Sequence, residues 1–227
     1  MIASAVVVAA GKGTRMGQTV NKVYIHLGGK PVLYYSLKVF DDIDCIKEII
    51  VVVSKEEMGY CQQNVIKKYS FKKPIKLVEG GSERQHSVYN GLINTSKHSE
   101  IVAIHDGARP LIDKEIVLNT LEQAYVYKAA AVGVPVKDTI KIVDEDNFIV
   151  STPDRKFLWA IQTPQVFERG LIIDAHQKAI KEGFIGTDDS VLVERLDYKV
   201  KVVEGNYKNI KITTPEDLIV AEAFLKK

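Results

Sequence analysis

Length, composition and charge exclude several classes of protein. The chain has 227 residues, 46% of them hydrophobic and 26% charged, which is typical of one globular domain. Its 31 basic and 29 acidic residues leave a net charge of +2, so no strong overall field favours a nucleic-acid partner. No apolar segment approaches the ~20 residues of a membrane span, and we expect no membrane partner.

The two cysteines predict neither a disulfide framework nor a zinc site. Cys45 and Cys61 form no CxxC motif and have no paired histidines nearby. The apolar run at 3–10 has no basic segment before it and is too short for a signal peptide with its cleavage site. We therefore expect a cytoplasmic protein.

Apolar segments rich in β-formers alternate with segments of helical period over the first 136 residues. The strands are apolar on both faces, which predicts an α/β fold with a mostly parallel sheet flanked by helices. Pro31 and Ser82 are expected in the first turn and at the N-cap of two of the helices. In chain order we predict a strand at 2–10, a helix at 31–40, a strand at 48–54, a helix at 56–69, a strand at 75–80, a helix at 82–95, a strand at 100–106, a helix at 114–127 and a strand at 129–136.

The pattern changes after residue 136, where a β-arm is inserted at about 137–160. Short alternating runs at 138–155 surround the turn-like sequence DEDN and predict a β-hairpin. A hairpin that protrudes from a sheet exposes its edges, so we expect this arm to pack on another subunit.

Helices and strands alternate again after the arm, and we expect one domain over 1–227. The last helix is predicted to begin at Thr214, with Pro215 at N1 and Asp217 at N3. Before it we predict helices near 168–181 and at 187–196, and strands at 198–205 and 208–213.

The segment AAGKGTRMG follows the first strand, as a phosphate-binding loop does. Gly11, Gly13 and Gly17 do not match G-x-G-x-x-G, because the third glycine comes one residue late. Glycines alone leave a plain tight turn equally open. Arg15 and Lys22 favour an anion site, since backbone N–H groups and two cations can together neutralise a polyphosphate.

Two further loops follow predicted strands. GGSER begins a helix whose N-terminus favours anions, although a tight turn with an N-cap explains this sequence as well. In IHDGARP, Asp106 is a natural Mg²⁺ ligand, and a salt-bridged turn between Asp106 and Arg109 is the alternative. We expect His105 to be a packed strand residue.

Two more loops add polar residues. One carries Arg155, Gln162 and Thr163, and the other carries Lys211 within the strand predicted at 208–213, where it can also face solvent. Ligands bind beyond the carboxyl ends of parallel strands, so these loops are expected to converge. A site rich in cations and without a nucleophile–base pair indicates phosphoryl or nucleotidyl transfer.

Seven segments, in order, resemble the 2-C-methyl-D-erythritol 4-phosphate cytidylyltransferase family. They are AAGKGTRMG…NK, GGSERQHSVYNGL, IHDGARP, PVKDTIK, DRKFLWAIQTPQVF, TDDS and EGNYKNIKITTPEDL. The resemblance implies a Rossmann-like nucleotidyltransferase fold, a homodimer joined through β-arms, and Mg²⁺. It implies transfer of CMP from CTP to 2-C-methyl-D-erythritol 4-phosphate, giving 4-CDP-2-C-methyl-D-erythritol and pyrophosphate in non-mevalonate isoprenoid biosynthesis.

The same resemblance implies roles for residues at matching motif positions. Arg15, Lys22 and Lys211 would be catalytic and lie near the reacting phosphates, and Asp106 would lie beside the ribose and the metal. The nucleotide would further contact Ala9, Ala10, Gly11, Gly13, Gly80, Gly81, Ser82 and Ser87. The polyol phosphate would contact Arg109, Thr139, Arg155 and Thr163, with Thr139 and Arg155 supplied by the partner's arm.

The chain departs from the family where the usual P-K-Q is Asn21-Lys22-Val23, and where HDAARP carries Gly107. A ribitol-5-phosphate cytidylyltransferase is the nearest alternative, although HDGARP and TDDS favour the methylerythritol enzymes. A dinucleotide-dependent oxidoreductase requires G-x-G-x-x-G and an acidic residue after the second strand, where this chain has Ser54-Lys55. A non-catalytic nucleotide-binding module does not account for basic residues spread over several loops.

Overall fold

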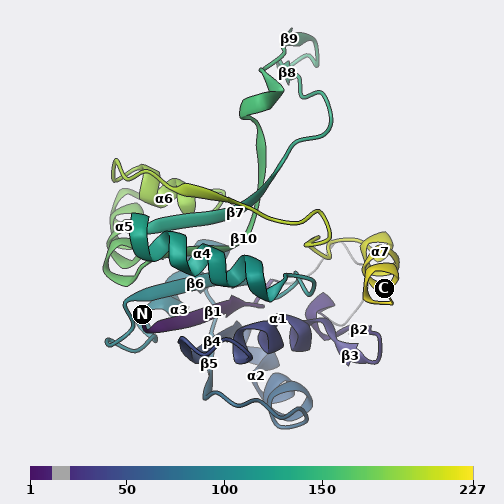
Figure 1. Ribbon diagram of the computed structural model, residues 1–227, viewed down its shortest axis with the longest axis vertical. Coiled ribbons are helices and arrows are strands. Elements are labelled where there is room, and N and C mark those ends of the chain that lie inside the picture. The colour runs from purple at the N-terminus through teal and green to yellow at the C-terminus, as the bar shows by residue number, and fades with distance from the viewer. Residues whose placement is uncertain (12–20, 227) are drawn as a thin grey trace.

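A seven-stranded sheet forms the centre of the protein (Figure 1). The computed structural model describes residues 1–11 and 21–226. The strand order is β11-β7-β10-β6-β1-β4-β5, and only the two pairs made by β10 are antiparallel. The predicted mostly parallel sheet is therefore confirmed. Its strands are β1 (Ala3–Val8), β4 (Ile46–Val53), β5 (Ile75–Glu79), β6 (Ile101–Asp106), β7 (Ala129–Pro135), β10 (Trp159–Glu168) and β11 (Lys201–Glu204).

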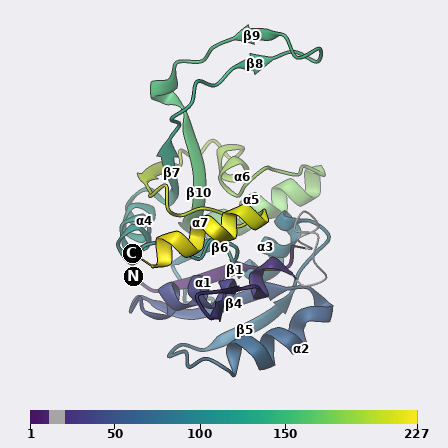
Figure 2. The same ribbon diagram turned by 90° about the vertical axis from the view of Figure 1, so that its right-hand side faces the viewer.

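Helices cover both faces of the sheet, and α4 and α5 lie on opposite sides in Figure 2. Along β1, Val7 packs in one buried cluster with Leu37 and Leu121, while Val6 packs in the other with Leu92 and Ile172. This burial on both faces explains why the central strands are continuously apolar. Among the described residues no helix combines the length and apolarity needed to cross a membrane. The helices are α1 (Val32–Asp41), α2 (Met58–Cys61), α3 (Arg84–Ile93), α4 (Lys114–Tyr127), α5 (Arg169–Glu182), α6 (Ser190–Glu194) and α7 (Pro215–Leu225).

Strand β10 lies where the sequence predicted a loop. The strand was not predicted because it contains polar residues. Gln162 and Gln165 are nevertheless buried, and they form hydrogen bonds instead of facing solvent. The Gln165 side-chain oxygen accepts from the backbone N–H of Asp189 and of Ser190 at the start of α6. A buried strand that supports a neighbouring helix end in this way shows no apolar period.

Three other local predictions were wrong. The segment 208–213 is not a strand, and its backbone forms turns and one bond from Ile212 N–H to the carbonyl of Ala108, 2.8 Å long. The helix predicted at 56–69 is a short α2 between 3₁₀ and π turns. Ser82 does not cap α3, which begins at Arg84 after Glu83. A small hairpin of β2 (His26–Leu27) and β3 (Lys30–Pro31) also went unpredicted.

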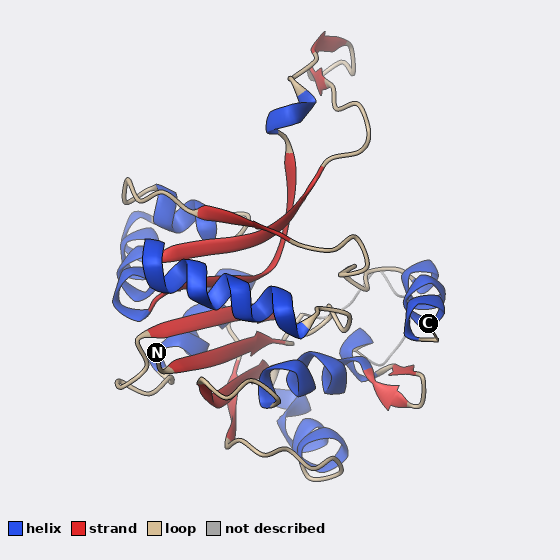
Figure 3. Cartoon of the chain, in the orientation of Figure 1, coloured by secondary structure: helices blue, strands red, loops and turns tan. Residues whose placement is uncertain are grey.

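The predicted hairpin is present and projects away from the sheet (Figure 1). Strands β8 (Ile142–Val143) and β9 (Ile149–Ser151) pair antiparallel, and most of the segment is drawn as loop in Figure 3. The expected turn forms because the Asp144 carboxylate accepts from the backbone N–H groups of Asp146 and Phe148. The α7 start is also as predicted, with Asp217 accepting from the backbone N–H of Thr214 at 2.8 Å.

Gly91→Ala should destabilise the protein. A Cβ at Gly91 in α3 would lie 2.5 Å from Val6 Cγ1 and 2.9 Å from Val52 Cγ2, so the helix must move off the sheet. The overpacking costs about 1–3 kcal/mol and outweighs the ~1 kcal/mol gain in helix propensity. Thermal unfolding should show a melting temperature lower by a few degrees. Gly59→Ala in α2, where a Cβ meets nothing within 4 Å, is the matched control and should not lower it.

Candidate active site

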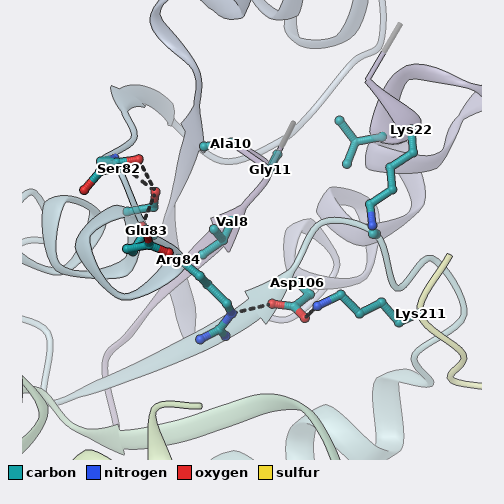
Figure 4. Close-up of a pocket in the computed structure, with 14 residues that line it drawn as sticks. Val8, Ala10, Gly11, Lys22, Ser82, Glu83, Arg84, Asp106 and Lys211 are labelled. Atoms are coloured by element: carbon teal, nitrogen blue, oxygen red, sulfur yellow. Dashed lines mark hydrogen bonds and ion pairs between the residues drawn. The ribbon is translucent and has the colours of Figure 1, made fainter. Parts of the chain in front are cut away.

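A pocket of about 520 Å³ lies beyond the carboxyl ends of β1 and β6 and beside the start of α3 (Figure 4). This is the edge of a parallel sheet where ligands bind. Its volume is in the range of small-molecule sites. The described residues that line it are Val8, Ala9, Ala10, Gly11, Lys22, Val23, Gly81, Ser82, Glu83, Arg84, Ser87, Asp106, Ala108 and Lys211.

Two backbone segments approach closely on one side of the pocket. Gly80 N–H donates to the Val53 carbonyl at 2.8 Å, and Gly81 N–H donates to Ser87 Oγ at 3.0 Å. A Cβ at Gly80 would lie 2.5 Å from Ala10 Cβ, so only glycine permits this approach. Gly80 therefore lies behind the pocket wall, whereas Ala10 and Gly81 line it.

Asp106, at the end of β6, forms two ion pairs. Its Oδ1 lies 3.1 Å from Arg84 Nε, and its Oδ2 lies 2.7 Å from Lys211 Nζ (Figure 4). Burial by itself raises the pKa of the Asp106 carboxyl, but the charges of Arg84 and Lys211 outweigh burial and hold that pKa well below its usual range. Asp106 is therefore ionised at neutral pH.

Arg84 connects Asp106 to a second buried carboxylate. Its Nη2 lies 2.9 Å from Oδ2 of Asp189, and Asp189 Oδ1 lies 3.4 Å from Nε2 of the buried His176. Burial raises the pKa of Asp189, while the charge of Arg84 and the proximity of His176 lower it to below its usual value. The sequence-based site omitted both Arg84 and Asp189. The sequence did contain a signal for this pairing. Arg84 is a cation in the first turn of a helix, where it opposes the helix dipole and therefore needs an acidic partner.

A chain of hydrogen bonds through Thr163 and His105 holds the backbone of Asp106 in place. Its backbone N–H donates to Thr163 Oγ1 at 3.0 Å, and the Thr163 hydroxyl lies 3.1 Å from His105 Nδ1. His105 Nε2 lies 3.0 Å from the carbonyl of Arg109, so Nε2 carries the proton and Nδ1 accepts from Thr163. Burial lowers the pKa of His105 to about 4, so the ring is neutral at pH 7. His105 is a packed strand residue, as predicted.

Arg109 does not form the salt-bridged turn offered as an alternative for its loop. Its Nη1 donates to the carbonyl of Asn209 at 2.7 Å, and within the described chain Asp106 forms its ion pairs with Arg84 and Lys211. Arg109 is absent from the described lining of the pocket. Its predicted role in binding the polyol phosphate stays a prediction.

Two predicted catalytic lysines reach the pocket from separate segments. Lys22 begins a 3₁₀ turn (Lys22–Tyr24), and Lys211 is positioned by the bond from Ile212 to Ala108. Figure 4 shows both lysines on the side of the pocket opposite Ser82. Gly13 and Arg15 fall in 12–20, outside the described residues.

The two predicted arm residues lie apart from this pocket. Thr139 and Arg155 are exposed, and neither belongs to the pocket lining. Arg155 Nη1 donates to the carbonyl of Lys137 at 2.7 Å, which orients it along the arm. Within one chain, the structure thus brings together nine of the predicted positions and leaves these two on the arm. The nine are Ala9, Ala10, Gly11, Lys22, Gly81, Ser82, Ser87, Asp106 and Lys211.

A metal ion in this pocket would depend on Asp106 and on a bound ligand. The described part of the chain has no group of three or more His, Cys, Asp or Glu side chains able to hold a metal. Mg²⁺ is commonly bound by one or two carboxylates together with substrate phosphates and water. The single carboxylate at the end of β6 fits that type of site and does not fit a structural zinc site.

Arg84→Ala should destabilise the protein in a pH-dependent way. The folded-state pKa of Asp189 is lowered, so its ionisation adds stability above the unfolded pKa of about 3.9, and this contribution is lost as the pH falls through the lower folded value. Without Arg84 the buried Asp189 charge loses its arginine partner, whereas Asp106 keeps its ion pair with Lys211. Urea unfolding should show a loss of about 3 kcal/mol at pH 7 that narrows near pH 4.

The control for Arg84→Ala is Lys72→Ala. Lys72 is mostly exposed and pairs with Asp42 at 3.1 Å, so its loss should cost less than ~1 kcal/mol. An Arg84→Ala deficit that is equal at both pH values would contradict the role given to Asp189.

Comparison with known proteins identifies the family. The sequence model described as 2-C-methyl-D-erythritol 4-phosphate cytidylyltransferase matches residues 3–227. Proteins of that name from Caldanaerobacter subterraneus subsp. tengcongensis and Alkaliphilus metalliredigens are 68% and 53% identical to this chain. The alignments cover 100% of both chains for the first, and 98% of this chain and 92% of the relative for the second.

A solved structure agrees with the sequence comparison. The 4-diphosphocytidyl-2C-methyl-D-erythritol synthase of Anaerococcus prevotii is 39% identical and superposes with a TM-score of 0.89 over 100% of this chain and 96% of that one. The Rossmann-like nucleotidyltransferase fold expected from the sequence is thereby confirmed. The chain belongs to the 2-C-methyl-D-erythritol 4-phosphate cytidylyltransferase family.

Proposed function

We propose that the protein transfers CMP from CTP to 2-C-methyl-D-erythritol 4-phosphate, giving 4-CDP-2-C-methyl-D-erythritol and pyrophosphate. The observation that carries this proposal is the pocket itself, whose lining combines a wall of close-packed backbone with the cations Lys22, Arg84 and Lys211, two of which pair with the ionised Asp106. A base suits the wall and a triphosphate suits the cations. The names of the relatives favour methylerythritol phosphate over ribitol phosphate as the acceptor.

The reaction needs positioning and charge rather than a covalent intermediate. A phosphate oxygen of the acceptor forms a bond to the α-phosphorus of CTP, while the bond to the bridging oxygen breaks and pyrophosphate leaves with the electron pair. Charge accumulates on the phosphate oxygens in this step, and fixed cations stabilise it. Lys22 and Lys211 are the described lysines that can do so, and Arg15 is proposed as a third cation from its motif.

We propose that Asp106 and the phosphates of CTP hold Mg²⁺, which supplies further charge neutralisation when bound. Arg84 and Lys211 each contact one Asp106 oxygen, and each carboxylate oxygen keeps a second lone pair for another contact. The two cations also fix the orientation of the carboxylate. Asp106 is thus an ionised oxygen ligand facing the pocket at neutral pH.

We also propose a homodimer in which the arm of one subunit completes the site of the other. Exposed apolar side chains are concentrated on the arm, between 41% and 74% accessible, and apolar surface of this kind favours a protein partner. Thr139 and Arg155 would then bind the polyol phosphate at the partner's pocket. We propose a cytoplasmic location as well, because the two cysteines form no predicted disulfide framework. The exposed apolar arm residues are Ile140, Ile142, Val143, Phe148, Ile149, Val150 and Phe157.

Pyrophosphate release from CTP tests the reaction. With Mg²⁺ present, 2-C-methyl-D-erythritol 4-phosphate should support release, and ribitol 5-phosphate should give a much lower kcat/KM, because the acceptor is discriminated by the groups that bind its polyol. A coupled phosphate assay and identification of the CDP product by mass spectrometry provide the measurement. A hundredfold preference for ribitol 5-phosphate would reverse the assignment of the acceptor.

Heterodimers test the shared site. Lys22→Ala and Arg155→Ala should each inactivate the homodimer, Lys22→Ala by roughly 10²-fold in kcat. In a heterodimer purified through two different tags, one site combines both changes and the other has neither. This heterodimer should therefore show about half the wild-type activity per dimer. A heterodimer as inactive as its parents would place both residues in one subunit's site.

A further inference from the structure

Asn21 precedes Lys22 in the chain and is almost completely buried at 7% exposure. It stands where the family pattern P-K-Q has proline. Its backbone φ of −59° is close to the value at which proline is fixed. In this chain, side-chain hydrogen bonds stabilise a conformation that a proline ring would impose.

The Asn21 side chain contacts three separate segments. Its Nδ2 donates to the carbonyl of Ala9 at 3.1 Å and to Glu57 Oε2 at 3.1 Å. Its Oδ1 accepts from the backbone N–H of Val23 at 3.3 Å, which starts the turn that carries Lys22. We call these four residues, Asn21, Ala9, Val23 and Glu57, the Asn21 network.

The network is anchored at the ends of two central strands. Ala9 follows β1, and its N–H donates to the Val52 carbonyl of β4 at 2.7 Å. Glu57 Oε2 also accepts from Ser54 Oγ at 2.9 Å, just after β4 ends. The next residue but one after Lys22, Tyr24, is buried and packs edge-to-face on Tyr60 with ring centroids 4.9 Å apart. One end of the turn is therefore fixed at the edge of the sheet through Asn21, and the other packs on α2 through Tyr24.

Few side chains can replace Asn21 here. The position requires a donor toward Ala9 and Glu57 and an acceptor toward Val23 at the same time, which a carboxamide supplies. Aspartate would bring a carboxylate against the Glu57 carboxylate and the Ala9 carbonyl. Proline would supply the backbone angle without either contact.

We infer that Asn21 is a positioning residue, which fixes the turn carrying Lys22 against the end of β1 through Ala9 and Glu57. Lys22 has a flexible four-carbon side chain, so the position of its Cα decides which part of the pocket its ammonium reaches. Ala9 lines the same pocket, and the network thus sets the spacing between the nucleotide-binding wall and Lys22. The inference rests on the proposed function, in which Lys22 stabilises charge at the transferred phosphate.

Exchanging the carboxamide of Asn21 and the carboxylate of Glu57 tests the network. Asn21→Asp should lower kcat at least about tenfold with KM for CTP within about threefold, because misplacing a transition-state cation affects kcat first. Glu57→Gln keeps an acceptor and should lose less than about threefold. The double variant Asn21→Asp/Glu57→Gln places an amide donor beside the new carboxylate and should regain part of the lost kcat, although the Ala9 carbonyl still lacks its donor. Asn64→Asp and Glu56→Gln, at exposed positions, are the matched controls and should equal wild type.

Each outcome decides for or against the inference. If Asn21→Asp keeps the wild-type kcat, or the double variant is no better than Asn21→Asp, the network does not position Lys22. A wild-type kcat in Lys22→Ala overturns it as well. If Asn21→Asp does not fold, Glu57→Ala replaces it, and its kcat must fall below that of Glu57→Gln. Wild-type protein that releases no pyrophosphate from CTP refutes the proposed function instead, which keeps the two failures distinct.

Discussion

The two ion pairs of Asp106 are the interaction on which the arrangement of the site depends. They join the end of β6 to the first residue of α3 through Arg84 and to the C-terminal segment through Lys211. A buried carboxylate without cations is costly, so the ion pairs favour the arrangement in which these three segments lie together. The same contacts leave Asp106 ionised and facing the pocket. One charge thus orients the groups on two sides of the pocket.

Ion pairs fix the position of Asp106, and hydrogen bonds fix the positions of other groups around the pocket. Thr163 and His105 form a neutral chain beneath Asp106, and Asn21 connects the other side of the pocket to β1 and to Glu57. These groups are buried and satisfied, and buried polar groups of that kind specify one geometry. The flexible lysines therefore extend from a rigid base. Such preorganisation suits a reaction in which proteins act by position and charge.

The arm stands outside this network. Its two short strands bond only to each other in the described chain, and its apolar side chains face solvent. A segment of this composition has little to stabilise it by itself. In the proposed homodimer, contact with a partner subunit would stabilise the arm and bring Arg155 and Thr139 to the pocket of the second copy.

The sequence by itself determined the elements whose pattern is local. The predicted elements include the apolar strands β1, β4 and β6, the helix α4 and the turn at Asp144. Each was predictable because burial on both faces, helical period and turn chemistry depend on residues that are close together in the sequence. The motif order also predicted the family and most of the pocket lining. Local pattern failed for β10, whose buried glutamines contact α6 and the segment near Asn206, far along the chain.

Only the tertiary structure decided how the charges pair. Asp106 has an arginine three residues away, yet it pairs with Arg84 and Lys211, and Arg109 turns to the carbonyl of Asn209. No spacing rule gives that choice, because it depends on which segments the sheet brings to its carboxyl edge. The same holds for Asn21. In the sequence it is only a departure from the P-K-Q pattern, because its contacts with Ala9 and Glu57 exist only once β1 and β4 lie side by side. Sequence pattern identified the residues with charge, and the packing of distant segments in a low-dielectric pocket determined their partners.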